Sequence, residues 1–152
     1  MHGFWKRWMA AWCGVVLAFG AILALVAWPQ AAAPGRFVFA LIGRDPATDA
    51  LLAQPGMRFA VGLMGALTIG LGLMIYGSVR AGADAAGWRS LTWAMLVWFV
   101  IDSAISVGTG FPLNAVSNAV LIAAYLAPVV RSGVLSITGA PTEAKASAPR
   151  PS

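Results

Sequence analysis

The sequence has few charged residues, one cysteine and one histidine, and each scarcity excludes a class of protein. Only 10% of its 152 residues are charged, whereas a soluble domain carries about 25%. Cys13 has no second cysteine with which to form an intrachain disulfide or a two-cysteine redox motif. Because His2 is the only histidine, we expect no zinc site and no haem-ligating histidine pair. No catalytic triad or glycine-rich phosphate loop is evident, so we expect no catalytic residue, metal or cofactor.

The net charge of +5 could indicate a nucleic-acid-binding protein, but the placement of the basic residues does not. They stand singly or in pairs beside apolar runs, as membrane-flanking anchors do. A nucleic-acid interface would gather them on one surface. We therefore expect membrane lipid, and no nucleic acid, as a partner.

Four apolar runs are long enough to cross a bilayer, which takes about 17 to 25 residues in a helix. They are Met9–Ala27, Met57–Val79, Leu91–Val107 and Leu113–Val130. The first run is longer than the core of a secretory signal, so we expect it to remain as a span. The sequence thus predicts an all-α bundle of four transmembrane helices over residues 1–131. Residues 132–152, rich in Ala, Pro, Ser and Thr, predict a disordered cytoplasmic tail.

Basic residues outside the spans predict the orientation of the bundle. With the N-terminus inside, seven are cytoplasmic: Lys6, Arg7, Arg80, Arg89, Arg131, Lys145 and Arg150. Three are then outside: Arg36, Arg44 and Arg58. Seven against three favours both termini in the cytoplasm.

The first two spans are joined by a long outer loop, Gln30–Gly56. Its apolar segment Phe37–Ile42 is too short to span and is expected at the interface or against the mouth of the bundle. Asp45-Pro46 resembles a helix start and predicts a short outer helix over Ala47–Gln54.

Small residues form stripes on the first two spans, as at packed helix faces in lipid. The first stripe is Ala10, Gly14, Ala18 and Ala21; the second is Gly62, Gly65, Ala66, Gly70 and Gly77. These faces are expected to pack within one chain or between copies in a homo-oligomer.

Asp102 lies inside the third apolar run, where an ionisable side chain costs several kcal/mol unless it faces protein or water. Polar side chains follow it at helical spacing on both sides of a tight turn: Ser103, Ser106, Thr109, Asn114, Ser117 and Asn118. They predict a polar stripe shared by the third and fourth spans. Two interpretations stay open: hydrogen bonds that hold the two helices together, or a pocket for a ligand or ion.

Three further residues are candidates for this pocket. Trp98 and Tyr125 could form its apolar wall, as in small-molecule sites generally. Arg58 could either snorkel to lipid phosphate or reach inward to Asp102. The predicted ligand-binding set is Asp102, Ser106, Thr109, Asn114, Asn118, Arg58, Trp98 and Tyr125.

The segment from Trp98 to Asn118, WFVIDSAISVGTGFPLNAVSN, resembles the core of small bacterial inner-membrane proteins broadly similar to the DoxX-like four-helix group. The likeness covers the second to fourth spans. It implies a four-helix fold in the bacterial inner membrane, and for some members a quinone-linked or thiol-linked redox role. This chain lacks the cysteine pair that a thiol-linked role needs.

These observations lead to one functional expectation and two alternatives. We expect a non-enzymatic inner-membrane protein that binds a small amphipathic or lipophilic molecule, or a membrane partner, through a pocket near the periplasmic side. The alternatives are a quinone-linked accessory subunit of a redox system and an oligomeric ion or proton pathway.

Overall fold

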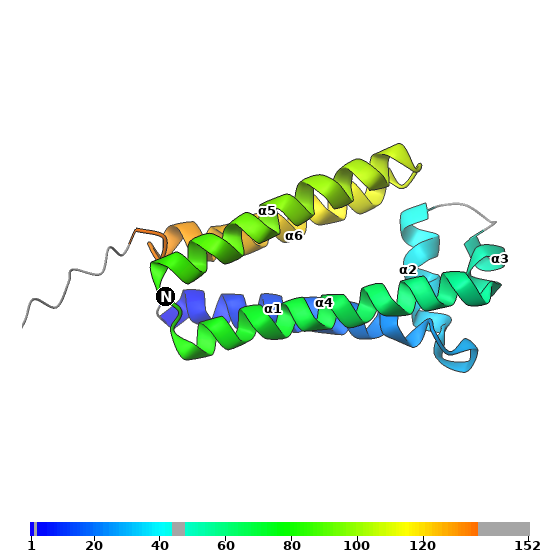
Figure 1. Ribbon diagram of the computed structural model, residues 1–152, viewed down its shortest axis with the longest axis horizontal. Helices are drawn as coiled ribbons and strands as arrows, with labels where there is room; N and C mark the ends of the chain where they lie inside the picture. The colour runs from blue at the N-terminus through cyan, green and yellow to red at the C-terminus, as the bar shows by residue number, and fades with distance from the viewer. Residues whose placement is uncertain (2, 44–47, 137–152) are drawn as a thin grey trace, which may run out of the picture.

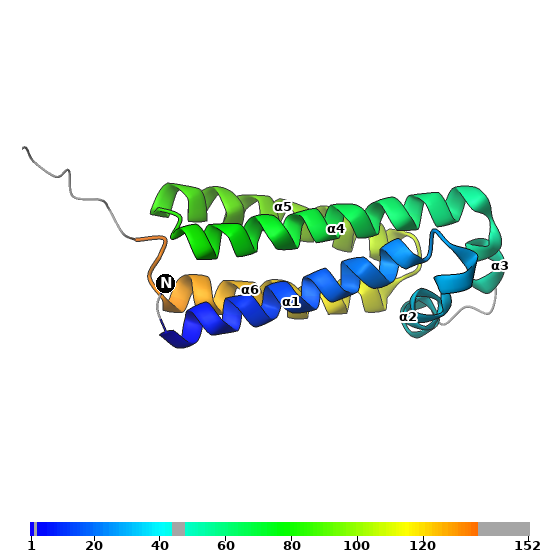
Figure 2. The ribbon, with the colours of Figure 1, turned by 90° about the horizontal axis from the view of Figure 1, so that it is seen from below.

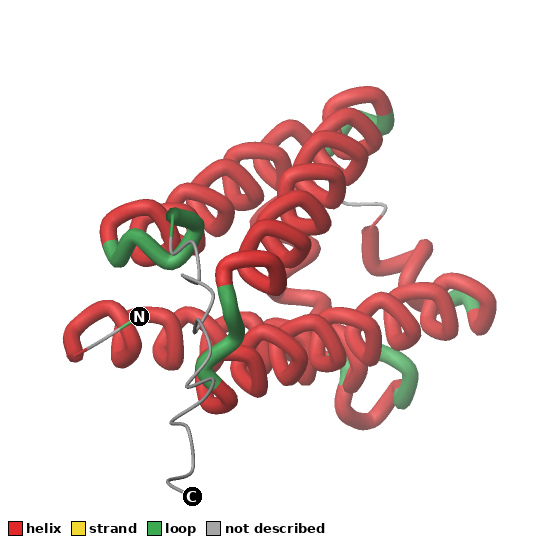
Figure 3. Tube along the Cα trace, turned by 60° about the vertical axis from the view of Figure 1, so that its left-hand side comes forward, coloured by secondary structure: helices red, strands yellow, loops and turns green. Residues whose placement is uncertain are grey.

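The computed structural model describes residues 1–136 except 2 and 44–47, and all its regular structure in these residues is helical (Figure 3). Four helices are long and apolar enough to cross a membrane: α1 (Gly3–Leu25), α4 (Pro55–Ala81), α5 (Ala85–Gly108) and α6 (Pro112–Arg131). They contain the four apolar runs, apart from the last two residues of the first. The predicted all-α, four-span architecture is confirmed.

The long connection between α1 and α4 is also largely helical. It contains a short 3-10 turn, η1 (Pro29–Ala31), and two helices, α2 (Ala33–Gly43) and α3 (Thr48–Ala53). The apolar segment Phe37–Ile42 lies within α2, and α3 falls inside the predicted short helix. The predicted helix start at Asp45-Pro46 lies outside the described residues. Both short helices sit at one end of the bundle, which we call the loop end (Figure 1). The opposite end, where α1 begins and α6 finishes, is the terminal end.

Local capping residues make α5 longer than its apolar run. Asp84 precedes α5, and its carboxylate accepts a 2.8 Å hydrogen bond from the Gly87 backbone N–H. Such an N-cap satisfies one free donor in the first helical turn. Gly82, at φ +69°, ends α4 in the left-handed conformation that suits glycine. α5 therefore begins at Ala85, six positions before the predicted Leu91.

The four long helices form two pairs, α1 with α4 and α5 with α6. The pairs lie close together at the terminal end and diverge toward the loop end, where α2 lies between them (Figures 1 and 2). α1 and α6 also touch, and α2 contacts both of them. The bundle thus consists of two helix pairs joined mainly at one end.

The α1–α4 pair is held by direct contact between backbones at small residues. A Cβ atom added to Gly65 would lie against the Ala24 backbone and 2.5 Å from the Gly20 carbonyl oxygen. A Cβ on Gly20 would lie 2.9 Å from the Gly65 carbonyl oxygen. Glycine is required at both positions because nothing larger fits between the two helices.

The structure corrects part of the predicted small-residue stripes. On α4, Gly62 and Gly65 face α1 as expected, but Ala66, Gly70 and Gly77 are exposed. On α1, the packed face carries Gly20 and Ala24, and Ala27, two residues past the end of the helix, also meets Gly62. Three residues of the predicted α1 stripe are exposed instead: Gly14, Ala18 and Ala21. The α1 sequence contains two small-residue stripes, and the one nearer the loop end makes the contact.

At the terminal end, two tryptophans of α1 bind backbone carbonyls of α6. Pro128 lies within α6 and has no N–H, so the Ala124 carbonyl lacks its normal helical donor. The Trp8 indole N–H donates to that carbonyl at 2.9 Å. One turn along, the Trp12 indole donates to the Leu121 carbonyl at 3.0 Å. The proline thus frees an acceptor that joins the two helix pairs.

Part of the predicted tail belongs to the bundle. Val134 is buried in the apolar cluster at the terminal end, together with Trp12 and Trp88. Arg89 donates a 2.9 Å hydrogen bond to the Leu135 carbonyl. The ordered domain therefore extends beyond the predicted boundary at residue 131 to at least 136. Residues 137–152 of the predicted tail lie outside the described residues.

Candidate functional site

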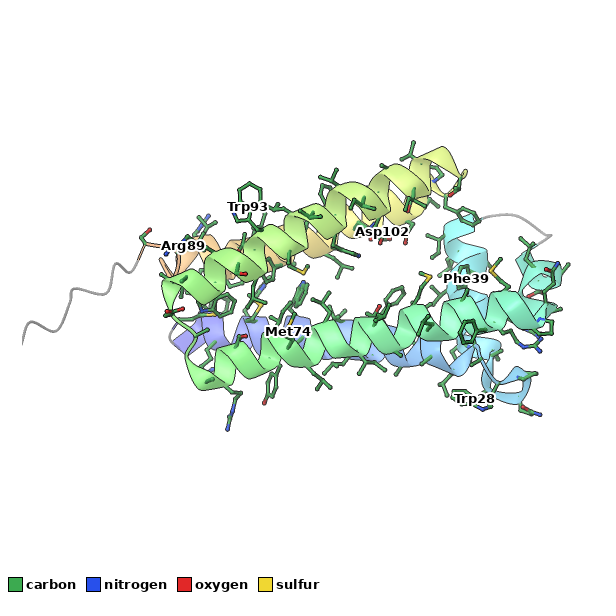
Figure 4. The ribbon with its side chains drawn as sticks, viewed as in Figure 1. Trp28, Phe39, Met74, Arg89, Trp93 and Asp102 are labelled. Atoms are coloured by element: carbon green, nitrogen blue, oxygen red, sulfur yellow. The ribbon has the colours of Figure 1, made fainter. Side chains whose placement is uncertain are left out.

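Asp102 occupies α5 two turns before its end, toward the loop end of the bundle. Figure 4 shows it on the side of the α5–α6 pair that faces the α1–α4 pair. The residue is half-buried, while its neighbours Ile101 and Ile105 are exposed on the outer surface of α5. The carboxyl group therefore lies within a membrane-spanning helix and is bordered by apolar surface.

Three polar side chains form one connected group across α5 and α6. The Asn114 amide donates to the Ser106 hydroxyl at 2.8 Å and to Asp102 Oδ1 at 3.3 Å. The Ser106 hydroxyl lies 2.7 Å from the Asp102 backbone carbonyl and 3.3 Å from Oδ1. We call Asp102, Ser106 and Asn114 the polar triad. The predicted polar stripe shared by the two helices is present at these residues.

The Asp102 carboxylate is only weakly bound within the triad. A hydroxyl has one proton, and the shorter contact of Ser106 is to the backbone carbonyl. Both contacts to the carboxylate are 3.3 Å long, whereas hydrogen bonds to ionised groups are typically about 2.7 to 2.9 Å. In the described part of the chain, both of these contacts reach Oδ1 and neither reaches Oδ2.

Two further polar atoms beside the triad are buried and have no hydrogen-bond partner among the described residues. They are Nδ2 of Asn118 and the hydroxyl of Ser103. Asn118 is only 4% exposed. Ser106 on α5 contacts Asn114 on α6. Because the two helices are antiparallel, Asp102 and Asn118 each lie one turn further from the connecting turn and are therefore at the same depth. A buried donor without an acceptor is costly and calls for an explanation.

Four residues of the predicted set lie apart from the triad. Arg58 lies near the start of α4, and its guanidinium donates to the Ala53 carbonyl. No ion pair between Arg58 and Asp102 is present in the described residues. Thr109 is exposed and donates to the Ile105 carbonyl at 2.7 Å. Trp98 is half-buried and packs against the apolar cluster at the terminal end. Tyr125 is the fourth, and it lies deeper in the bundle.

The position of Tyr125 differs most from the prediction. It is fully buried in the apolar cluster, with its hydroxyl 3.4 Å from that of Thr92 and its ring centroid 5.5 Å from that of Trp12. Thr92 lies almost three helical turns from Asp102, or about 15 Å. Tyr125 shares a helix face with Asn118 but not its depth, so it belongs to the core.

Several interactions were missed in the sequence. Thr92 donates to the Trp88 carbonyl and contacts Tyr125. The apolar sequence around Thr92 did not indicate either contact. The contact of Trp8 with the Ala124 carbonyl had one signal in the sequence, Pro128, which predicts a free acceptor one turn earlier. The contact of Trp12 with the Leu121 carbonyl had none. Ser103 was recognised as part of the polar patch, but its lack of a partner is visible only in the structure.

The described residues of this site offer one carboxyl group with hydroxyl and amide neighbours. Among the described residues that form it, Asp102 is the one with an ionisable side chain. Within the described ranges, no group of three His, Cys, Asp or Glu side chains could hold a metal ion. A single carboxylate with neutral neighbours is a weak catalytic set.

Comparison of the chain with protein-family models, with curated proteins and with solved structures gives no match in any of the three. The resemblance to the DoxX-like group therefore stays a prediction.

Proposed function

We propose that this multi-pass membrane protein binds an amphipathic small molecule, with the polar end of the molecule at Asp102, Asn118 and Ser103. The observation that carries the proposal is the incomplete hydrogen bonding of this group. Among the described residues, the carboxylate accepts only long contacts, and Nδ2 of Asn118 and the hydroxyl of Ser103 have no hydrogen-bond partner. A ligand would complete these interactions.

The alternative is that the polar stripe only holds α5 and α6 together. Interhelical hydrogen bonds in membranes contribute about 0.6 to 2 kcal/mol each. The bond from Asn114 to Ser106 already provides this at 2.8 Å. Asp102, Asn118 and Ser103 add little to it, because their contacts are long or absent. Helix association alone does not explain why they are polar.

The apolar body of the ligand follows from the surroundings of the site. Asp102 lies within a span, and the adjacent surface of α5 is made of exposed apolar side chains such as Ile101 and Ile105. A molecule that reaches the carboxylate from the bilayer must be stable among such side chains. This favours a lipid or lipid-like molecule over a small hydrophilic solute.

We further propose that the protein lies in a bacterial inner membrane with both termini in the cytoplasm. The excess of basic residues at the terminal end supports this orientation. The site would then lie in the periplasmic half of the bilayer. Reporter fusions after Ser152 and beside Asp49 should report opposite sides of the membrane.

Native mass spectrometry of the gently solubilised protein tests ligand binding. We expect a retained amphiphile on the wild-type protein and at least a tenfold lower bound fraction on Asp102→Asn, which keeps the shape of the side chain but cannot ionise. Asp49→Asn, on an exposed residue of α3, is the matched control and should retain the ligand. If the wild type retains no amphiphile, or if both variants retain it equally, the proposal is wrong.

A further inference from the structure

We propose that the polar end of the ligand carries an ammonium group that binds Asp102 Oδ2, next to an oxygen acceptor that binds Asn118. This inference rests on the proposed function and names the class of its ligand. Amphiphiles of this class include lipids with an aminoethyl headgroup and free long-chain amino alcohols. The shared chemistry is a positive nitrogen close to a hydrogen-bond acceptor, attached to an apolar chain.

The charge of the site favours a positively charged ligand. The donors that reach Asp102 are a hydroxyl and an amide, both neutral. A carboxylate within a span usually pairs with a positive group, but among the described residues no basic side chain fills this role. Arg58 is bound to the Ala53 carbonyl and Arg89 to the Leu135 carbonyl. A ligand can supply the positive group that Asp102 lacks among the described residues.

The existing contacts of Asp102 leave one carboxylate oxygen available to a ligand. The side chains of Ser106 and Asn114 both approach Oδ1. In the described residues, Oδ2 thus keeps its acceptor capacity. An ammonium group has three donors and no acceptor, and so complements a carboxylate oxygen. A phosphate or carboxylate headgroup without an amine would instead be repelled by Asp102.

The unpartnered donor beside the carboxylate requires an acceptor on the ligand. Asn118 Nδ2 is buried and lies one turn from the Ser106–Asn114 contact, level with Asp102. An ammonium group cannot accept its proton, so a second ligand atom must be an acceptor. The unpartnered hydroxyl of Ser103 can donate to the same acceptor or accept from the amine. The site therefore favours a headgroup with both functions over a simple amine.

A series of amphiphiles with one chain length and different headgroups tests the charge requirement. Dodecylamine, dodecanol and dodecanoate are each added to the delipidated protein in a neutral detergent, and the bound fraction is measured by native mass spectrometry. We expect dodecylamine to bind at least tenfold more tightly than dodecanol, with no binding of dodecanoate. The preference should disappear in Asp102→Asn and persist in Asp49→Asn.

The source of the amine is tested in nanodiscs that contain equal amounts of phosphatidylethanolamine and phosphatidylglycerol. Selective retention of phosphatidylethanolamine would identify a lipid headgroup. Binding of dodecylamine without lipid selectivity would indicate a free long-chain amino alcohol as the source of the amine; either result supports the inference. Equal, Asp102-dependent binding of dodecanol and dodecylamine, or selective retention of phosphatidylglycerol, would overturn it while amphiphile binding stood. If no amphiphile binds, the proposed function fails as well.

Discussion

The two helix pairs of this protein are held together by different kinds of contact. α1 and α4 meet through glycine and alanine, with backbones in direct contact at Gly20, Ala24 and Gly65. α5 and α6 meet through polar side chains at the triad and at the pair of Thr92 and Tyr125. In the described chain, no side-chain hydrogen bond joins α1 to α4. A stable pair in a bilayer evidently needs no polar side chain.

This difference indicates that helix packing alone does not require the polar residues of α5 and α6. Small residues alone allow close helix packing in lipid, so Asp102, Asn118 and Ser103 are not required for the fold on general grounds. Their hydrogen bonds are also incomplete. We therefore assign the α1–α4 pair to stability and the loop-end half of the α5–α6 pair to binding.

The largest expected effect is the loss of the α1–α4 contact in Gly65→Ala. The new Cβ would meet the Ala24 backbone and the Gly20 carbonyl oxygen, neither of which can rotate away. We expect a loss of about 2 to 3 kcal/mol in the free energy of unfolding, measured by SDS titration in mixed micelles. Gly70→Ala is the control, because no atom lies within 4 Å of its added Cβ. Similar losses in both variants would show that close contact at Gly65 is not what holds the pair.

A smaller effect is expected at the junction of the two pairs. Trp8→Phe removes the donor to the Ala124 carbonyl and should lower the free energy of unfolding by about 1 kcal/mol. In a Pro128→Ala background, the backbone N–H at position 128 can bond this carbonyl, so the loss should fall to less than half. Trp93→Phe, at a site 69% exposed, controls for the change of ring. An equal loss in both backgrounds would refute the link between Trp8 and Pro128.

The smallest expected effect is the coupling between Arg58 and Asp102. The two residues have separate partners, the Ala53 carbonyl and the polar triad. Stability losses in Arg58→Ala and Asp102→Ala should therefore add in the double variant to within about 0.5 kcal/mol. A larger coupling energy, measured in the same SDS titration, would show that the two residues interact and would bring Arg58 back into the site.

Much of the fold could be predicted because apolar run length and turn residues are local features. The four spans, α3 and the hairpin of α5 and α6 follow from them. The packed face of α1 could not be predicted, because two small-residue stripes lie on one helix and only the partner helix selects between them. The role of Arg58 depends on the start of α4 at Pro55, which places Ala53 within its reach.

The sequence predicted that a polar group would form on α5 and α6, but not which of the candidate residues would belong to it. Asp102, Ser106 and Asn114 come together because a tight turn places them at equal depth on adjacent helices. Tyr125 was assigned to the site because helical periodicity reports the face of a helix and not the depth of a residue. Unpartnered donors such as Asn118 Nδ2 cannot be recognised before the neighbouring helix is placed.

Asn118→Leu is the measurement that tests most directly whether the polar residues of the α5–α6 pair serve binding or packing. Leucine has a similar shape and removes the buried donor that lacks a partner, which should raise the free energy of unfolding of the delipidated protein by about 1 kcal/mol. The same variant should lose the retained amphiphile at least tenfold in native mass spectrometry. A variant that is destabilised and still retains the amphiphile like the wild type would contradict the account and assign Asn118 to helix packing.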